Sequence, residues 1–182
     1  MPTPVKNKKG YTYSDYLTWP DEERWEIING EAYDMTPAPG TKHQRLVWNL
    51  VRKISNHLEG HKTCQGFSAP TDVILDEHNV VQPDVFVVCD RSKVREKAVK
   101  GAPDLVVEVT SPTTELKDKR EKKNLYERFG VPEYILVFPE REYIEHYVLE
   151  EGKYGVPEIL NWDETLRVVT LGMEIDLWEL FE

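Results

Sequence analysis

The sequence predicts a layered domain of the α/β or α+β class, with a mixed central β-sheet flanked by helices. Short runs that are apolar on both faces, as in strands covered on both sides, occur at residues 84–88, 104–109 and 133–138. Two helical stretches, at 41–59 and 111–130, alternate with these runs along the chain. Helices interleaved with buried strands are typical of a sheet that carries helices on its faces.

Length and composition favour one folded domain. The chain has 182 residues, of which 40% are hydrophobic and five are Trp, which excludes a disordered chain. Residues 1–10 have no apolar period, and we expect a flexible N-terminal tail there. We expect residues 11–182 to form the single domain.

The N-terminal part predicts a short helix and a β-hairpin. Residues 12–19 read as a helix capped by Thr12 or Ser14. The pair Asn29-Gly30 stands between two alternating runs and predicts a hairpin with a type I′ turn.

A loop at 37–40 leads to the first long helix, which we expect to run from Thr41 to about Glu59 and to end at Gly60. Its apolar residues recur at helical spacing: Leu46, Val47, Leu50, Val51, Ile54 and Leu58.

Strands follow at 62–67, 71–75, 84–88 and 104–109. The second helix, 111–130, has Ser111 or Thr113 as its cap and Gly130 as its stop.

The buried strand at 133–138 comes after that second helix, so the crossover from 104–109 predicts a right-handed parallel βαβ unit. Residues 142–150 read as its hairpin partner, and 166–169 and 175–180 as an edge strand and a final short element.

The charge balance is acidic, 23 minus 33 or −10, which counts against a broad, non-specific nucleic-acid surface. Two basic runs, 91–100 and 117–123, stand out from this background. By composition alone, each is a solvated face.

Cys64 and Cys89 form no CxxC motif, and we expect them to be small core residues in a reducing compartment, the cytoplasm. No apolar run approaches the roughly 20 residues of a membrane span, and no signal peptide is present, so we expect no membrane partner.

Two carboxylates interrupt or border the buried strands. Asp84 opens the run at 84–88, and Glu108 stands among valines one residue before the end of 104–109. Buried carboxylates need a shared proton, a basic partner or a cation. Mg²⁺ or Mn²⁺ prefers oxygen ligands, and the carbonyl of Val109 would be a natural third ligand.

A basic partner for these carboxylates is available on the second helix. Lys122 can approach its core face, and Lys119 lies three residues earlier on nearly the same stripe. A lysine there could lower the pKa of a metal-bound water or stabilise a pentavalent phosphate. The alternative is that Lys122 is an ordinary solvated lysine.

The pattern "QPDVFVV" followed after about twenty residues by "APDLVVEVTSP" resembles the PD…(D/E)xK motif of the restriction-endonuclease-like nuclease superfamily. With "RWEIINGEAYDM", "PAPGTKHQRLVWNL" and "PDLVVEVTSPTTELKDKREKKNLYERFGVPEYILV", the chain resembles the Uma-type restriction endonucleases over about residues 11–178.

The resemblance implies an α-β-β-β-α-β core with Asp84 and Glu108 as metal ligands. Two residues after Glu108, where the superfamily has lysine, this chain has Thr110, and Lys122 is the position that matches a lysine shifted to the following helix. Glu26 and His43 match recurrent family positions and are candidates to line the same pocket.

Each site residue also has a structural interpretation. Asp84 would cap a turn, Glu108 would pair with Lys122 alone, Glu26 would be an exposed hairpin carboxylate, and His43 a surface histidine in the first turn of its helix.

We therefore predict a Mg²⁺- or Mn²⁺-dependent DNA endonuclease, acting as a homodimer, with the two basic runs facing DNA. A non-catalytic interaction module that retains the nuclease fold is the alternative from another class. Carboxylate acid–base hydrolysis of a sugar is a second enzymatic alternative.

Overall fold

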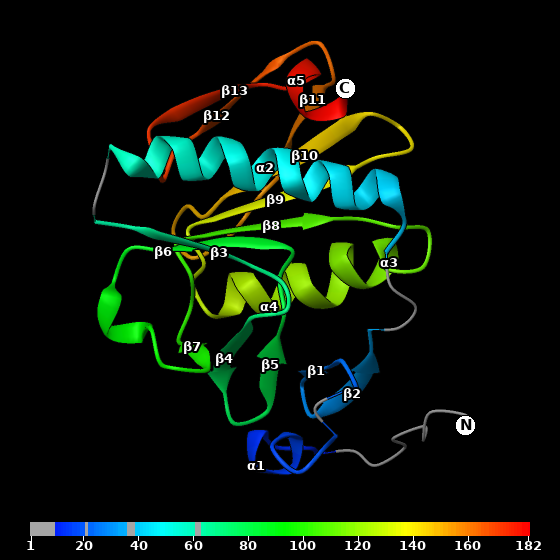
Figure 1. Ribbon diagram of the computed structural model, residues 1–182, viewed down its shortest axis with the longest axis vertical. Coiled ribbons are helices and arrows are strands. Elements are labelled where there is room, and N and C mark those ends of the chain that lie inside the picture. The colour runs from blue at the N-terminus through cyan, green and yellow to red at the C-terminus, as the bar shows by residue number, and fades with distance from the viewer. Residues whose placement is uncertain (1–9, 21, 36–38, 61–62) are drawn as a thin grey trace.

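The computed structural model describes residues 10–20, 22–35, 39–60 and 63–182 (Figure 1). Most of the expected tail, part of the expected loop at 37–40 and the start of the expected strand at 62–67 lie outside the described residues. The single domain over 11–182 stays a prediction.

A six-stranded mixed sheet forms the centre of the molecule, with the strand order β11-β10-β9-β8-β6-β3. Its only parallel pair among the described strands is β8 with β9, which confirms the predicted crossover. The strands are β3 Gln65–Ser68, β6 Val85–Val88, β8 Leu105–Val109, β9 Glu133–Phe138, β10 Tyr143–Val148 and β11 Glu158–Asn161.

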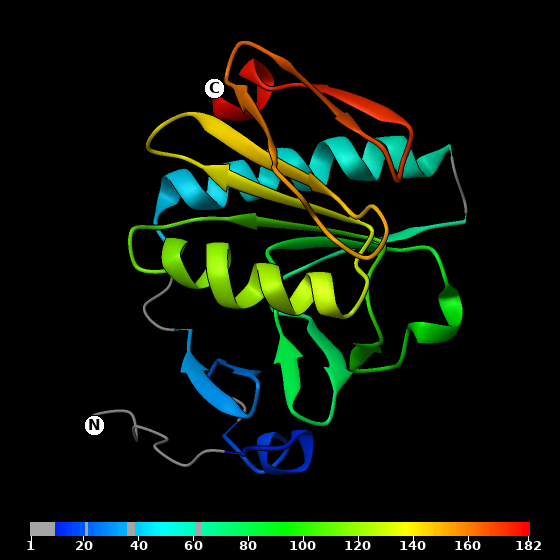
Figure 2. The ribbon, with the colours of Figure 1, turned by 180° about the vertical axis from the view of Figure 1, so that it is seen from behind.

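Helices cover both faces of this sheet (Figures 1 and 2). Helix α2, Thr41–Glu59, has the bounds that its apolar spacing predicts. It packs on one face through three buried residues that meet the inward side chains of β6 and β8: Leu46, Leu50 and Ile54. The opposite face is covered by the second helical segment, so the strands are buried on both sides, as their apolar runs indicate.

The second helical segment is not one α-helix. It consists of α3 Glu115–Lys117, the π-helical turn η2 Asp118–Lys122 and α4 Lys123–Arg128. Gly130 ends it with a φ of 72°, which confirms the predicted stop. The hydroxyl of Ser111 accepts a hydrogen bond from the N–H of Thr114, ahead of the first helical residue.

A second sheet, of order β2-β1-β5-β4-β7, lies on the side of the molecule that carries α3 and α4. Asn29 and Gly30 both have positive φ, 53° and 74°, as the predicted type I′ turn requires. The elements are α1 Tyr13–Tyr16, β1 Trp25–Ile28, β2 Glu31–Asp34, β4 Asp72–Asp76, β5 Asn79–Val81 and β7 Ala98–Lys100.

The predicted cap of α1 is confirmed, since Thr12 and Asp15 form a capping box. The expected strand at 71–75 exists as β4, but it joins the second sheet instead of the central one. Strands β5, β7 and β11 were not predicted; β7 lies inside the basic run 91–100, together with the 3-10 turn Arg91–Lys93.

The C-terminal part forms a two-stranded sheet and a short helix, which lie beyond α2 (Figure 2). These elements are β12 Thr165–Val168, β13 Met173–Asp176 and α5 Trp178–Phe181. The expected edge strand corresponds to β12, and the expected final element corresponds to the end of β13 and α5.

The expectation for the cysteines was wrong, because Cys64 and Cys89 form a disulfide. The antiparallel register of β3 and β6 pairs Gln65 with Val88, so the next residues outward face each other. The cysteine count therefore no longer supports a reducing compartment. None of the helices in the described part of the chain has the length and apolarity needed to cross a membrane.

Candidate active site

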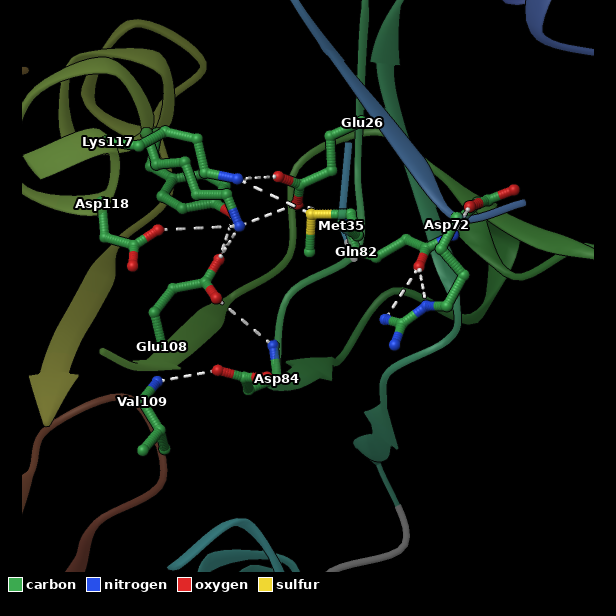
Figure 3. A network of polar contacts seen from close by, with 12 residues as sticks. Glu26, Met35, Asp72, Gln82, Asp84, Glu108, Val109, Lys117 and Asp118 are labelled. Carbon is green, nitrogen blue, oxygen red and sulfur yellow. Dashed lines mark hydrogen bonds and ion pairs between the residues drawn. The ribbon is translucent and has the colours of Figure 1, made fainter. Parts of the chain in front are cut away.

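The pairing of β6 with β8 brings the two predicted carboxylates together. The register that pairs Val85 with Val107 places Asp84 opposite Glu108. The backbone N–H of Asp84 donates to Glu108 Oε2 at 3.4 Å, and the N–H of Val109 donates to Asp84 Oδ2 at 2.8 Å (Figure 3). The two strand ends are therefore joined through the side chains that interrupt them.

Glu108 points toward the second helical segment, where two donors meet one of its oxygens. Lys122 Nζ lies 2.8 Å from Glu108 Oε1, and the hydroxyl of Tyr126 donates to the same atom at 2.9 Å. Burial raises the pKa of Glu108, and although Lys122 lowers it, the nearby carboxylates of Asp118 and Asp84 help to bring it to about 8. The strand therefore tolerates Glu108 because donors on the helix satisfy it.

Lys122 is a buried cation and not a solvated helix lysine. Its side chain is 2% exposed, and its Nζ lies 2.7 Å from Glu26 Oε1 and 3.9 Å from Asp118 Oδ1, in addition to Glu108. Burial lowers the pKa of Lys122, but these carboxylates outweigh burial and raise it well above its ordinary value. The ammonium thus stays charged and balances several buried anions at once.

Thr110, at the position where the superfamily pattern has lysine, donates its hydroxyl to the Val137 carbonyl at 3.1 Å. The hydroxyl of Thr110 is therefore bound to strand β9 and does not contact Glu108. The lysine that contacts Glu108 instead comes from the helix, as the resemblance implies for Lys122.

Glu26 is fully buried, so the interpretation as an exposed hairpin carboxylate is wrong. Its Oε1 accepts from the N–H of Gln82 at 3.0 Å and its Oε2 lies 2.9 Å from Lys117 Nζ. Burial raises the pKa of Glu26, but Lys122 and Lys117 more than offset it and lower the pKa to about 2. The accessory hairpin thereby contributes a permanent anion that holds two lysines.

His43 lies in the first turn of α2, as predicted, and faces the same strand ends. Its Nε2 is 3.2 Å from Asp84 Oδ2, and its side chain is only 12% exposed. Its Nδ1 is buried without a hydrogen-bond partner among the described residues. His43 is therefore part of the cluster and not a surface histidine.

An open cavity of about 490 Å³ lies over this cluster. Its walls come from α2, the ends of β6 and β8, and the second helical segment, and they include His43, Asp84, Glu108, Val109, Lys117 and Lys122. Glu26 is not among the lining residues, since it lies behind the two lysines that it binds. Five of the six residues assigned to the site from the sequence thus share one cavity, and the sixth, Glu26, supports it.

Sequence reasoning missed Lys117, Asp118 and Tyr126. Lys119, the alternative to Lys122 as the catalytic lysine of this helix, points away from the cluster, and its Nζ lies 2.6 Å from Glu145 Oε1. Helical spacing alone placed Lys119 on the stripe of Lys122, and the π-turn between them changes that alignment.

The two basic runs have different surroundings from those expected. The run 117–123 is not a solvated face, because several of its side chains are engaged with carboxylates and aromatic rings. The run 91–100 follows the end of β6 that is remote from Asp84, and none of its residues is among those that line the cavity. It therefore does not border the cavity.

The donor set of the cluster suits a hard divalent cation. Asp84 Oδ1 has no hydrogen bond among the described residues, and Glu108 Oε2 has only the long contact at 3.4 Å. Each carboxylate thus keeps one oxygen that can face the cavity. The described residues contain no group of three or more His, Cys, Asp or Glu that could hold a metal ion. A cation bound here would need backbone and water oxygens as well, as Mg²⁺ commonly does.

The mixed central sheet with helices on both faces is a restriction-endonuclease-like fold. The crystal structure of a putative nuclease belonging to DUF820 from Anabaena variabilis superposes with a TM-score of 0.78 at 19% identity, over 93% of this chain and 97% of that one. This similarity confirms the predicted fold class.

The sequence of the chain identifies the family to which it belongs. The Uma2 family, described as "Putative restriction endonuclease", matches residues 13–177, and the chain belongs to this family. An uncharacterized protein of Synechocystis sp., slr1290, is 33% identical over 171 residues, covering 90% of this chain and 88% of that protein. The resemblance stated from the sequence motifs is confirmed.

Proposed function

We propose that the protein is a metal-dependent endonuclease that hydrolyses phosphodiester bonds in DNA. The observation that carries the proposal is the convergence of Asp84 and Glu108 at two adjacent strand ends, with a buried lysine on Glu108. Membership of the Uma2 family supports it.

Asp84, Glu108 and the Val109 carbonyl would hold the Mg²⁺ or Mn²⁺ ion. When bound, the ion supplies Lewis-acid activation of a water and neutralises charge on the phosphate. The proposed role of Lys122 is to fix the Glu108 carboxylate, so that this proposed ligand keeps the ion and the water on it in position.

Two further residues are proposed to position this machinery. Glu26 holds Lys122 from behind through its Oε1. His43 fixes Asp84 through its Nε2 contact to Oδ2. Both act on the direct ligands or on the lysine, so each is a positioning residue in this proposal.

DNA is the proposed substrate and a homodimer the proposed assembly, because cleavage of both strands needs two sites related by a two-fold axis. The acidic net charge of −10 argues against a broad DNA-binding surface, so the proposed DNA contacts are local to the cavity, whose lining includes Arg24, Lys117 and Lys122. The cytoplasm remains the proposed compartment, on the ground that the DNA substrate is there.

The experiment is a nicking and linearisation assay on supercoiled plasmid with Mg²⁺ or Mn²⁺, with EDTA as the metal-free reference. The Glu108→Gln and Asp84→Asn variants should each lose at least about a hundredfold in rate, because each loses a proposed ligand charge. Glu145→Gln is the matched control, since Glu145 is a buried, lysine-paired glutamate outside the cavity. Cleavage by Glu108→Gln at the wild-type rate would refute the assignment.

The interaction module remains the second candidate. The observation in its favour is that Lys122 already balances Glu26 and Glu108 without any metal. This candidate predicts plasmid left intact at every metal concentration, in wild type and in both variants.

A further inference from the structure

The π-turn η2 places two lysines on one carboxylate. Lys117 and Lys122 are five residues apart, and in a regular α-helix they would lie about 140° apart around the axis. In η2 the N–H of Lys123 donates to the Asp118 carbonyl, five residues back, so the turn winds more loosely. The two lysines therefore come closer together around the axis than in a regular α-helix, and their ammonium groups contact the two oxygens of Glu26.

The two lysines have different surroundings. Lys122 is 2% exposed and contacts three carboxylates, so its positive charge is balanced by groups of the protein itself. Lys117 is 14% exposed, lines the cavity and contacts one carboxylate, that of Glu26. Only Lys117 has capacity left toward the cavity.

The hydrogen-bonding capacity of Lys117 supports this distinction. An ammonium has three N–H donors. Lys117 Nζ contacts Glu26 Oε2 at 2.9 Å and, weakly, the sulfur of Met35 at 3.6 Å (Figure 3). It also lies 5.5 Å from the ring centroid of Tyr33. In the described part of the chain, no further polar group contacts this nitrogen.

Binding of a DNA phosphate in this cavity requires a positive charge that offsets the repulsion from the carboxylates. Five carboxyl groups line it, those of Asp34, Asp84, Glu108, Asp118 and Glu121, so an approaching phosphodiester meets mainly acidic side chains. Arg24, the basic residue of the lining besides the two lysines, donates two hydrogen bonds to the side chain of Gln82. Lys122 is screened from the phosphate by its own partners. A cation that is anchored from behind and open toward the cavity can attract the phosphate without disturbing the Lys122–Glu108 pair.

We propose that Lys117, aligned with Lys122 by the π-turn and anchored on Glu26, is the phosphate-binding residue of the site and contacts a non-bridging oxygen of the DNA backbone. This inference rests on the proposed function. It gives the two lysines different roles: Lys117 binds the substrate, whereas Lys122 holds the Glu108 carboxylate for the hydrolysis step.

The test compares Lys117→Met, Lys117→Arg and the control Lys119→Met. Lys119 lies two residues away in the same basic run but pairs with Glu145 outside the cavity. Binding of a short fluorescent duplex is measured in EDTA from low to high salt, and kcat and KM are measured with Mn²⁺.

For Lys117→Met we expect a salt slope of log K smaller by about 0.9 and a KM raised roughly tenfold, with kcat within about threefold of wild type. Lys117→Arg should restore most of the affinity, and Lys119→Met should match wild type. A structural role alone would lower the thermal midpoint and leave the salt slope unchanged, which would overturn the inference.

The two proposals fail differently. Wild-type protein that binds DNA through Lys117 but does not cleave it refutes the endonuclease and leaves the phosphate site standing. Cleavage by wild type with unchanged KM and salt slope in Lys117→Met refutes the phosphate site alone. Absence of duplex binding by wild type in EDTA and with Mn²⁺ would overturn the inference as well.

Discussion

Replacing Lys122 with Met should destabilise the fold strongly and in a pH-dependent way. The side chain of Lys122 is 2% exposed and neutralises Glu26 and Glu108 at 2.7 and 2.8 Å. Removing one partner of a buried ion pair costs about 3–5 kcal/mol of unfolding free energy, because the remaining charge has no compensation. For a chain of this length, that corresponds to a fall in Tm of about 6–20 °C.

The sign of the pH dependence follows from Glu26. In wild type its pKa is lowered from 4.5 to about 2, so the stability it contributes is present above pH 4.5 and is lost as the pH falls toward 2. Without Lys122, burial is opposed mainly by Lys117, and we expect burial to prevail and raise the pKa of Glu26 above 4.5, so that the folded variant keeps the proton. The deficit of the variant should then grow by up to about 1.4 kcal/mol per pH unit from pH 5 upward.

The assay is urea unfolding of wild type and Lys122→Met at pH 5.5, 6.5 and 7.5. Lys119→Met is the control, since that lysine is one-third exposed and its partner Glu145 keeps a hydrogen bond from the Tyr147 hydroxyl, so its loss should cost clearly less than the loss of Lys122. Adding Glu26→Gln to Lys122→Met should recover part of the loss. A deficit below about 1 kcal/mol that does not change with pH would refute the reasoning that Lys122 balances buried charge.

Three further predictions concern other groups. A Cys64→Ser, Cys89→Ser variant should lose about 3 kcal/mol in urea unfolding, from the entropy of a 25-residue separation, and the denatured wild type should titrate no free thiol; free thiols would contradict the disulfide. Burial lowers the pKa of His146, but Glu133, 2.6 Å away, outweighs it and raises the pKa. The stabilising effect of the His146–Glu133 pair should therefore be complete below pH 6.5 and be lost as the pH rises through the raised pKa of His146. An NMR titration of His146 checks this, and a pKa below 6.5 would contradict it. Because the pKa of Glu108 is raised to about 8, a proton should compete with Mg²⁺, and affinity measured by calorimetry should fall up to tenfold per pH unit below pH 8; a flat profile would contradict it.

The sequence predicts those elements whose signals are local. Helix α2 is confirmed in both bounds because its apolar period and Gly60 lie within one segment. The β1–β2 hairpin is confirmed because Asn29-Gly30 alone defines a type I′ turn. The β8–β9 crossover follows from two buried runs with a helix between them.

Features that depend on register between distant segments were missed. The disulfide requires the pairing of Gln65 with Val88, and nothing near either cysteine reports it. The short strands β5 and β7 carry too few residues for a clear alternation, and β7 lies within a basic run.

The same distinction between local and long-range signals explains why the candidate site was predicted only in part. Asp84 and Glu108 stand out because carboxylates interrupt apolar strands. Lys117 was missed because an α-helical period places it away from Lys122, whereas the π-turn brings both onto Glu26. The sequence contains no pattern that predicts a π-turn, so the alignment of Lys117 with Lys122 is known only from the structure.

The measurement that tests the central claim most directly is Mn²⁺ and Mg²⁺ binding by titration calorimetry, on wild type, on an Asp84→Asn, Glu108→Gln double variant and on Glu145→Gln. The account predicts that wild type and Glu145→Gln bind the cation and that the double variant does not. Absence of binding by wild type, with or without duplex DNA, would contradict it and make Asp84 and Glu108 structural residues.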